Sequence, residues 1–386
     1  MREVAVLGVG QVPVGEHWER ALVELAGEAA HLALDDAGLE RVDSLYLANM
    51  LAATSGSAQL NLGAQLADWC GLRGIEAYKV ETACGSGGAA FRAGVLAVAS
   101  GQMGRVLVVG AEKMTHSPGA ETTTALATAA DADYEVAHGP SFVALNALIM
   151  RRYQHEYGWQ HDHFAPFSVN AHANGARNPY ARLQQPISEQ DYRRARMICD
   201  PINLLDSSPI GDGAAAVVLV PASAVPPNGN RPRVIVAGSG AATDSLAIHD
   251  RSAPLWLSAA ERSARQAYDQ AGLGPEQVDF FELHDAFSIM AALSLEACGF
   301  ANPGQAPRLA LDGVILPTGR LPIATHGGLK ARGHPVGASG VYQIVEVTRQ
   351  LRGEAGPNQV ESPRVGMAQS IGGSGATILT HILRRS

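Results

Sequence analysis

The sequence predicts an α/β protein built from two similar halves. Helical and strand patterns alternate along most of the 386 residues, which is typical of sheets covered by helices. The segment ALDDAGLERVDSLYLA (33–48) recurs as AYDQAGLGPEQVDFFELH (267–284), and VAVLGVG (4–10) recurs as VIVAGSG (234–240). We therefore expect an internal duplication, a mostly parallel sheet, and two halves packed face to face with a site between them.

The first half shows strands and helices in alternation. A helix is expected over 18–37, because its apolar spacing is helical and Gly38 follows it in a common position for glycine after a helix. The small apolar residues of 81–100 predict a second, buried helix. Apolar runs predict strands over 4–8, 42–48, 105–110 and 214–220.

The alternation stops between Thr115 and about Arg196, where small polar residues and loop-like stretches prevail. We expect an insertion packed over the sheet, with a helix over 141–157. A linker rich in Pro, Asn and Gly (221–233) then separates the halves. The predicted division is therefore residues 1–225, including the insertion, and residues 232–386.

Composition narrows the functional class. The formal net charge of −8 argues against non-specific binding to nucleic acid or to an anionic membrane. The four cysteines are scattered without a CxxC pair, which favours a reduced cytoplasmic protein with no metal site and no disulfide framework. The sequence opens directly with a strand pattern, and no apolar run is long enough to span a membrane.

Cys84 is the first candidate catalytic residue. It precedes a predicted helix whose first turn, Gly85 to Gly88, is almost bare of side chains. The positive end of a helix dipole favours a thiolate, the form of cysteine that attacks carbonyl carbons. A small buried cysteine in the core is an equal alternative at this point.

Three loops of the second half add further candidates. His284 ends a predicted strand in ELHDAFS (282–288), where a structural histidine is an equal alternative to an acid–base group. His334 lies between glycine and proline ahead of a predicted helix in GGLKARGHPVGASG (327–340), which favours a functional role. The turn SIGGSG (370–375) offers backbone N–H groups that suit an oxyanion hole. A cysteine at a helix start, two histidines and a glycine turn point to acyl transfer by a Cys–His site.

Over nearly its whole length the chain resembles the thiolases, most closely the archaeal-type and sterol-carrier-protein-type acetoacetyl-CoA thiolases. The resemblance rests on several motifs, of which GHPxGxSG in register with an upstream cysteine is the most specific. They are MREVAVLGVGQ, ETACGSGG, VGAEKMT, SSPIGDGAAAV, ELHDAF, GGLKARGHPVGASG and GGSGATILTHIL. The family fold it implies is two duplicated α/β halves in five αβαβα layers, with an inserted loop domain that binds CoA.

The resemblance also implies roles for single residues. Cys84 takes the acyl group from acyl-CoA, and His334 accepts the Cys84 proton and helps to orient the thioester oxygen. His284 holds the enolate oxygen, directly or through water. The backbone N–H groups of Cys84 and Gly372 form a second oxyanion hole. CoA thioesters, as used in lipid metabolism, are then substrates rather than permanently bound cofactors, and a homodimer or homotetramer is expected.

The second catalytic cysteine of thiolases is missing. Family members carry it either where this chain has Ala286 or where it has Ser370. Cys298 follows nearby in a helical stretch and is one candidate substitute; His284 or a bound water is another. A further departure is Ala324–His326, ATH, where the family has NPS. No role is assigned to His326.

These departures leave several functions open. The leading hypothesis is a thiolase-type acyltransferase that runs acetoacetyl-CoA thiolysis or its reverse. The alternative is a C-acyltransferase on a non-CoA acceptor, working with a small OB-fold or zinc-ribbon protein. A steroid side-chain aldolase of the same fold is disfavoured by the intact ETACGSGG loop, and a non-catalytic scaffold by the retained thiol. Basic residues of the insertion suit CoA phosphates without any one being assigned; they are Arg151, Arg152, Arg177 and Arg182.

Overall fold

The computed structural model describes residues 2–54, 58–225 and 231–386. Predicted linker residues 226–230 lie outside the described part of the chain. The strands are β1 (Val4–Gln11), β2 (Ser44–Ala48), β3 (Glu76–Val80), β4 (Val106–Glu112), β5 (Met197–Cys199), β6 (Ile202–Asn203), β7 (Gly213–Pro221), β8 (Val234–Thr243), β9 (Phe280–Glu282), β10 (Val365–Gly372) and β11 (Thr377–Arg385). The α-helices are α1 (Leu22–Ala37), α2 (Leu62–Trp69), α3 (Ser86–Ser100), α4 (Gly119–Ala127), α5 (Phe142–Tyr157), α6 (Ala165–Gly175), α7 (Glu189–Arg194), α8 (Ser258–Ala271), α9 (Ser288–Ala297), α10 (Ala306–Leu311) and α11 (Ser339–Arg352).

The main sheet repeats the same strand arrangement twice. Its order is β3-β2-β4-β7-β1-β8-β11-β10-β9, so counting outward from the centre β1 corresponds to β8, β7 to β11, β4 to β10 and β2 to β9. The two parts meet at β1 and β8, which pair only through Val4–Val6 and Val234–Val236. The internal duplication expected from the repeated segments is therefore confirmed.

The sheet is mixed, and the expectation of a mostly parallel sheet is wrong. β2 pairs in parallel with β3 and β4, and β9 pairs in parallel with β10. The pairings of β7 with β1 and β4, of β8 with β1 and β11, and of β10 with β11 are antiparallel. A strand covered on both faces is apolar throughout in either direction, so apolar runs do not reveal strand direction.

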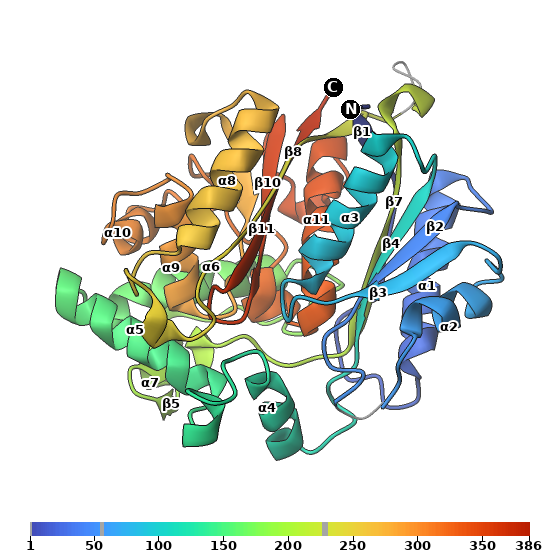
Figure 1. Cartoon of the computed structure of the whole chain (residues 1–386). Coiled ribbons are helices and arrows are strands. Elements are labelled where there is room, and N and C mark those ends of the chain that lie inside the picture. The colour runs from blue at the N-terminus through green and yellow to red at the C-terminus, as the bar shows by residue number, and fades with distance from the viewer. Residues whose placement is uncertain (1, 55–57, 226–230) are drawn as a thin grey trace.

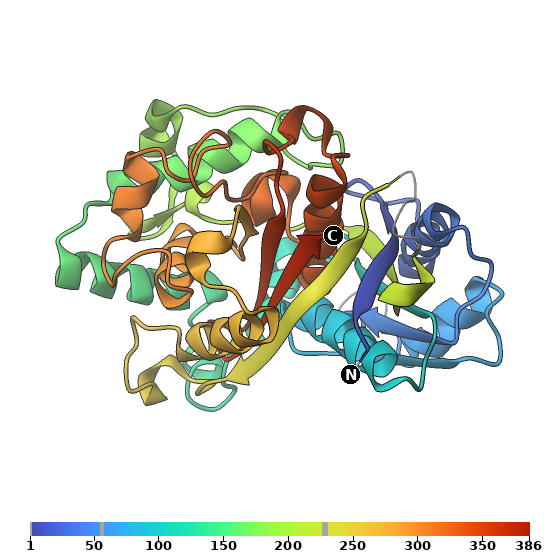
Figure 2. The same cartoon turned by 90° about the horizontal axis from the view of Figure 1, so that it is seen from above.

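Five layers form around the two parts of the sheet (Figures 1 and 2). Helices α1 and α2 cover the outer face of the first part, and α8 covers the outer face of the second. Helices α3 and α11 form the central layer between the two parts of the sheet. Phe91 of α3 and Val341 of α11 belong there to one core that also contains Val217 of the first part and Ala368 of the second. This layer brings the N-terminal ends of α3 and α11 together at the centre of the molecule.

The insertion forms a helical cover at one end of the molecule (Figure 1). It holds α4 to α7, and the predicted helix over 141–157 is α5, which begins after Ser141. Tyr153 and Phe164 pack into the core that also contains Leu293 of α9, so the insertion rests mainly on helices of the second half. Among the described residues, no helix has both the length and the apolar composition needed to cross a bilayer.

Candidate active site

A sharp turn presents Cys84 at the start of α3. Ala83 has a φ of 51°, a left-handed conformation that is uncommon for alanine. The Ser86 hydroxyl donates to the Ala83 carbonyl at 2.5 Å and accepts the Thr82 N–H at 3.0 Å, which holds this conformation in place. Strain at a turn between strand and helix is typical of a positioned nucleophile.

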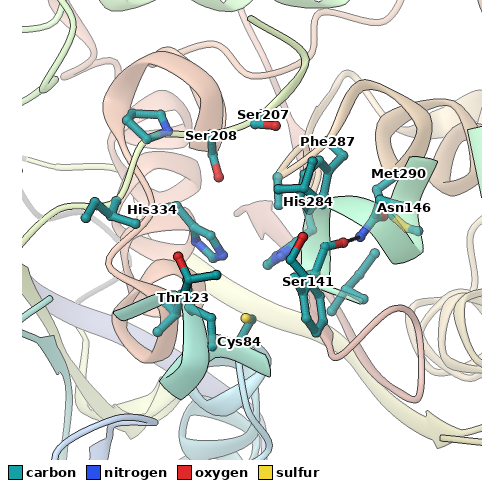
Figure 3. Close-up of a pocket in the computed structure, with 18 of the residues that line it drawn as sticks. Cys84, Thr123, Ser141, Asn146, Ser207, Ser208, His284, Phe287, Met290 and His334 are labelled. Carbon is teal, nitrogen blue, oxygen red and sulfur yellow. Dashed lines mark hydrogen bonds between the residues drawn. The ribbon is translucent and has the colours of Figure 1, made fainter. Parts of the chain in front are cut away.

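Cys84, His284 and His334 line one cavity of about 310 Å³ (Figure 3). The cysteine comes from the first half of the chain and the histidines from the second, and all three are at most 7% exposed. The two imidazole rings meet edge to face, with centroids 5.1 Å apart and planes at 86°. The structure thus brings together three of the four residues that the sequence singles out, across the junction of the halves.

Hydrogen bonds select one tautomer of His334. Its Nδ1 lies 2.7 Å from the Ser339 hydroxyl, and that hydroxyl donates its own proton to the Pro335 carbonyl at 3.2 Å. Ser339 therefore accepts a proton from His334 Nδ1, and Nε2 carries the free lone pair. A neutral imidazole with a bare Nε2 in the cavity wall is suited to accept a proton from a nearby thiol.

His284 is held differently. Its Nδ1 is buried and has no hydrogen-bond partner among the described residues, which leaves Nε2 to face the cavity. A buried N–H without a partner loses a full hydrogen bond, so the tautomer with the proton on Nε2 is favoured. His284 then offers an N–H donor to whatever occupies the cavity.

The resting site is uncharged. Burial lowers the pKa of His284 to about 3 and the pKa of His334 well below its usual range, and the charge of Arg332 adds to both effects. Burial also raises the pKa of the Cys84 thiol to about 12, with the Glu112 carboxylate adding to the rise. The expectation that the helix end favours a resting thiolate is wrong, because loss of hydration outweighs the helix dipole.

Glu112 ties the loops around the cavity together, although the sequence did not single it out. Its buried carboxylate accepts N–H bonds from Met50 at 2.8 Å, Leu51 at 3.1 Å and Gly337 at 3.0 Å. Gly337 lies three residues beyond His334, so Glu112 connects the His334 loop to the first half. The sequence signal for Glu112 is a carboxylate at the end of the apolar strand pattern VLVVGAE.

Gly372 lies against the Cys84 loop at the end of β10. A β-carbon placed on Gly85 would lie 3.1 Å from the Gly372 nitrogen, and one placed on Gly372 would lie 2.3 Å from the Thr82 carbonyl. Its neighbours Ile371 and Gly373 line the cavity. Only a residue without a side chain allows this approach of β10 to the nucleophile turn.

The positions where thiolases carry a second cysteine differ in their access to the cavity. Ala286 lines it, so only a methyl group stands there. Ser370 is 1% exposed and donates its hydroxyl proton to Gln343 at 3.1 Å, away from the described lining residues. Cys298 also lies outside the described lining, and its sulfur accepts a hydrogen bond from Gln369 at 3.0 Å. The structure does not bring Cys298 to the site.

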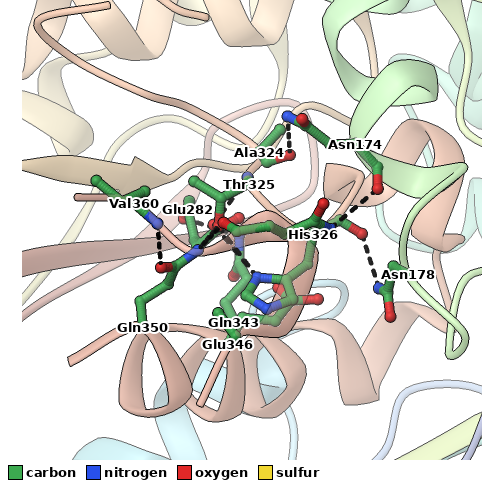
Figure 4. A network of polar contacts seen from close by, with 12 residues as sticks. Asn174, Asn178, Glu282, Ala324, Thr325, His326, Gln343, Glu346, Gln350 and Val360 are labelled. Carbon is green, nitrogen blue, oxygen red and sulfur yellow. Dashed lines mark hydrogen bonds and ion pairs between the residues drawn. The ribbon is translucent and has the colours of Figure 1, made fainter. Parts of the chain in front are cut away.

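The ATH segment forms a polar network behind the site (Figure 4). Thr325 donates to Glu282, and its hydroxyl lies 3.0 Å from His326 Nδ1. The His326 carbonyl accepts a hydrogen bond from Asn178 of the insertion at 2.8 Å. His326 is thus a link between β9 and the insertion and is not part of the cavity lining that the structure describes.

The four basic residues considered for CoA phosphates each contact a neighbour. Arg151 pairs with Asp200, Arg152 with Glu156 and Arg182 with Glu16, and Arg177 donates to Asn174. None of them lines the cavity within the described residues. Their existing contacts favour a structural role for each of them, and no CoA ligand is assigned.

The resemblance implies that the insertion binds CoA, but the sequence does not predict which of its side chains form the cavity wall. The cavity wall includes side chains from the start of α5 and from the loop after β6, in addition to those of the second half. The lining residues from the insertion are Thr123, Leu126, Ser141, Phe142, Val143 and Asn146, and those from the loop after β6 are Ser207, Ser208, Pro209 and Ile210. Small and apolar residues in an insertion give no local signal of this position.

Two family models match the chain. The model described as thiolase, N-terminal domain, matches residues 4–223, and the model described as thiolase C-terminal domain-like matches residues 240–385. The Cys84 loop falls in the first matched region, and both cavity histidines fall in the second.

Related proteins cover nearly the full length. An acetyl-CoA acetyltransferase of Methanothermobacter thermautotrophicus is 41% identical over 100% of both chains. The benzoylsuccinyl-CoA thiolase subunit BbsB of Thauera aromatica is 32% identical, over 96% of this chain and 95% of its own. Among solved structures, the Ltp2-ChsH2(DUF35) aldolase superposes with a TM-score of 0.86 at 25% identity, over 99% of this chain and 98% of the other.

Proposed function

The chain belongs to the thiolase family and is a thiolase-type acyltransferase, and from this premise we propose that Cys84 carries the acyl group from an acyl-CoA to a carbon acceptor. The observation that supports this is the meeting of Cys84, His284 and His334 in one buried cavity. A thiol, an imidazole base and an N–H donor are the groups that acyl transfer requires.

In the first half-reaction His334 acts as the base. Its bare Nε2 accepts the Cys84 proton as the sulfur attacks the thioester carbon, and it returns the proton to the departing CoA thiolate. The thiolate and the imidazolium formed together stabilise each other, although burial disfavours either charge alone. The N–H groups of Cys84 and Gly372 are proposed to bind the oxygen that becomes negative.

In the second half-reaction His284 serves the acceptor. Its Nε2–H is placed to bond the oxygen of an enolate, which lowers the energy of the carbanion that attacks acyl-Cys84. The start of α5, which belongs to the insertion, forms part of the cavity wall that the acceptor would contact. This position supports binding of the CoA thioester against the insertion. CoA thioesters act here as substrates, and no permanently bound cofactor is proposed.

Intact-protein mass spectrometry tests the nucleophile. Incubation with acetyl-CoA is expected to add one acetyl group to the native protein and none to Cys84→Ala. Cys298→Ala is the control, because Cys298 lies outside the described cavity lining and its loss leaves Cys84 in place. Acetylation of Cys84→Ala would show that the acyl group is carried elsewhere.

A second candidate is transfer to a non-CoA acceptor with a small OB-fold or zinc-ribbon partner. Ala286 in the cavity favours it, because the usual second cysteine is absent there. The Thauera relative is named as a subunit, and the solved neighbour is named as Ltp2 with ChsH2(DUF35). Co-purification of a small protein encoded beside this chain would support the candidate; full acyl transfer to acyl-CoA by the isolated chain would argue against it.

We further propose that the protein is a cytoplasmic homodimer or homotetramer. We also propose that each chain divides into two halves, residues 1–225 and residues 232–386. Light scattering on the purified protein tests the oligomeric state. A molar mass near 40.3 kDa, that of one chain, would contradict an oligomer.

A further inference from the structure

We propose that Arg251 is a positioning residue of the acyl-transfer site, whose buried guanidinium holds the turn after Gly372 and gives the proposed oxyanion hole a positive environment. The inference rests on the acyl-Cys84 function proposed above and adds a residue to its machinery. Arg251 lies outside the described cavity lining, so its role is to act through the turn that it holds.

The turn between β10 and β11 begins at Gly372, one of the two proposed N–H donors, and lies at the end of the molecule that carries the insertion (Figure 1). Gly372 pairs with Thr377, and its carbonyl accepts the Ala376 N–H at 3.0 Å. Between them, Gly373 and Gly375 have φ values of 63° and 111°. Glycine adopts such conformations readily but brings no side chain to anchor them, so the turn depends on its neighbours for a fixed position.

Arg251 holds this turn from the segment that follows β8. Its Nη1 donates to the Ser374 carbonyl at 2.7 Å, and its Nε donates to the Ser245 carbonyl at 3.3 Å. A β-carbon placed on Gly375 would lie 3.3 Å from Nη1, so the guanidinium packs directly against the turn. Because one planar guanidinium binds carbonyls of two segments, it fixes the turn relative to the segment after β8.

The insertion contributes to the same group of contacts. A β-carbon placed on Gly373 would lie 2.8 Å from the Ala129 carbonyl. The Glu135 carboxylate accepts the Ile248 N–H at 2.8 Å, and the Ile248 carbonyl accepts the Arg251 N–H at 3.2 Å. The glycine turn, Arg251 and the insertion are therefore connected, and Gly373 carries this connection to the cavity wall.

The charge of Arg251 has no direct partner among the described residues. The residue is 5% exposed, its Nη2 has no hydrogen-bond partner, and its other side-chain bonds go to neutral carbonyls. The charges of Asp244 and Glu135 favour the guanidinium only from a distance, and burial lowers its pKa. A buried cation with so little compensation is costly, which points to a use for its charge.

A positive charge beside this turn favours acyl transfer. The thioester oxygen becomes negative in the tetrahedral intermediate, where the N–H groups of Cys84 and Gly372 are proposed to bind it. A fixed positive charge lowers the energy of that state in a site where water does not screen it. The charge acts less on the neutral carbonyl of the ground state, so it increases the rate of acyl transfer more than the affinity for acyl-CoA.

Two variants separate the charge from the hydrogen bond to Ser374. Arg251→Lys keeps a charged donor and should retain most of the native rate of Cys84 acetylation by acetyl-CoA. Arg251→Gln keeps an amide donor without charge and should be at least about tenfold slower, a part of the 10²–10³-fold loss on removal of a direct oxyanion donor. KM for acetyl-CoA should change less than about twofold. A native rate in Arg251→Gln, or a loss confined to KM, would overturn the proposal.

Infrared spectroscopy of the acetyl enzyme gives a readout that a merely structural role would not move. Hydrogen-bond donors polarise the carbonyl of ¹³C-labelled acetyl-Cys84 and lower its stretching frequency. The band should move to higher frequency in Arg251→Gln and stay near its native position in Arg251→Lys. Arg265→Gln is the matched control, because the Arg265 side chain is 70% exposed and pairs with Glu261 within α8. An unchanged band in Arg251→Gln would overturn the proposal, whatever its rate.

Arg251→Lys keeps the test decisive if Arg251→Gln does not fold. Burial lowers the pKa of a lysine, so its charge is lost at alkaline pH, whereas the native guanidinium stays charged. Acetylation by Arg251→Lys should therefore fall relative to the native protein between about pH 6 and pH 10. Parallel profiles would overturn the proposal. A native protein that never acetylates Cys84 would instead refute the proposed function, and the role of Arg251 with it.

Discussion

Among single residues, Glu112 affects Cys84 in two opposing ways. Its carboxylate accepts N–H bonds from Met50 of the first half and Gly337 of the second half, and its negative charge raises the pKa of Cys84. Burial raises the pKa of Glu112 itself to about 7, so this charge grows as the pH rises through neutrality. The same side chain therefore positions the His334 loop and suppresses the thiolate.

Glu112→Gln is expected to separate these effects. Without the charge, the pKa of Cys84 falls, and alkylation by iodoacetamide becomes several-fold faster above pH 7. The amide NH₂ cannot accept the N–H bonds of an oxygen, so acetyl transfer becomes slower. Glu81→Gln is the control, because Glu81 also raises the pKa of Cys84, but to a smaller extent, and does not contact the His334 loop in the described structure. If alkylation and acetyl transfer changed in the same direction, the two-role interpretation would be wrong.

At the scale of elements, the contact of α3 with the second part of the sheet contains a buried histidine. His381 of β11 meets Phe91 of α3 edge to face at 4.8 Å, and its Nδ1 lies 3.1 Å from the Ser239 hydroxyl of β8. Burial lowers the pKa of His381 to about 3, well below the value near 6.5 of an exposed histidine. Between about pH 3 and pH 6.5 the imidazole is therefore neutral in the folded protein but protonated in the unfolded chain.

This depression predicts a pH-dependent loss of stability. Below about pH 6.5 the unfolded state binds a proton that the folded state does not, so stability falls by roughly 1.4 kcal/mol per pH unit until the pH nears 3. Chemical unfolding of the native protein and of His381→Asn at pH 7 and pH 5 checks this. The stability advantage of the native protein should shrink by about 2 kcal/mol at pH 5. A constant difference would show that His381 is not held neutral.

At the scale of the whole molecule, the junction of the halves depends on glycines where α3 meets α11. A β-carbon placed on Gly340 would lie 2.4 Å from the Gly88 nitrogen, and one placed on Gly87 would lie 2.7 Å from the Gly340 Cα. Cys84 precedes one of these helices and His334 the other. The close helix contact therefore sets how the catalytic groups of the two halves face each other.

Gly340→Ala is expected to impair both stability and catalysis. The added methyl group must push the helices apart, because its nearest neighbours include backbone atoms of Gly88 and Gly87 that cannot rotate away, beside the Ser370 hydroxyl. We expect a loss of about 1–3 kcal/mol in unfolding free energy and at least a tenfold slower acetylation of Cys84. Gly119→Ala is the control, since a β-carbon there meets nothing within 4 Å. Acetylation of Cys84 at the native rate in Gly340→Ala would show that the junction tolerates separation of α3 from α11.

The sequence alone determined much about this protein, because its evidence was local. The repeated segments predicted the duplication, and the loops around Cys84, His284 and His334 predicted the site residues that meet in the cavity. Helix periodicity located α1 and α5 to within a few residues. A resemblance carried by short loops also identified the family, which the two matching family models confirm.

Tertiary structure alone decided the properties that depend on surroundings. Strand direction was one, because a strand buried on both faces is apolar in either orientation. The protonation of Cys84 was another, because burial outweighs a helix end that is visible in the sequence. The wall of the cavity was a third: α5 and the His334 loop meet there from distant parts of the chain, and no local pattern records which side chains will face each other across a shared space.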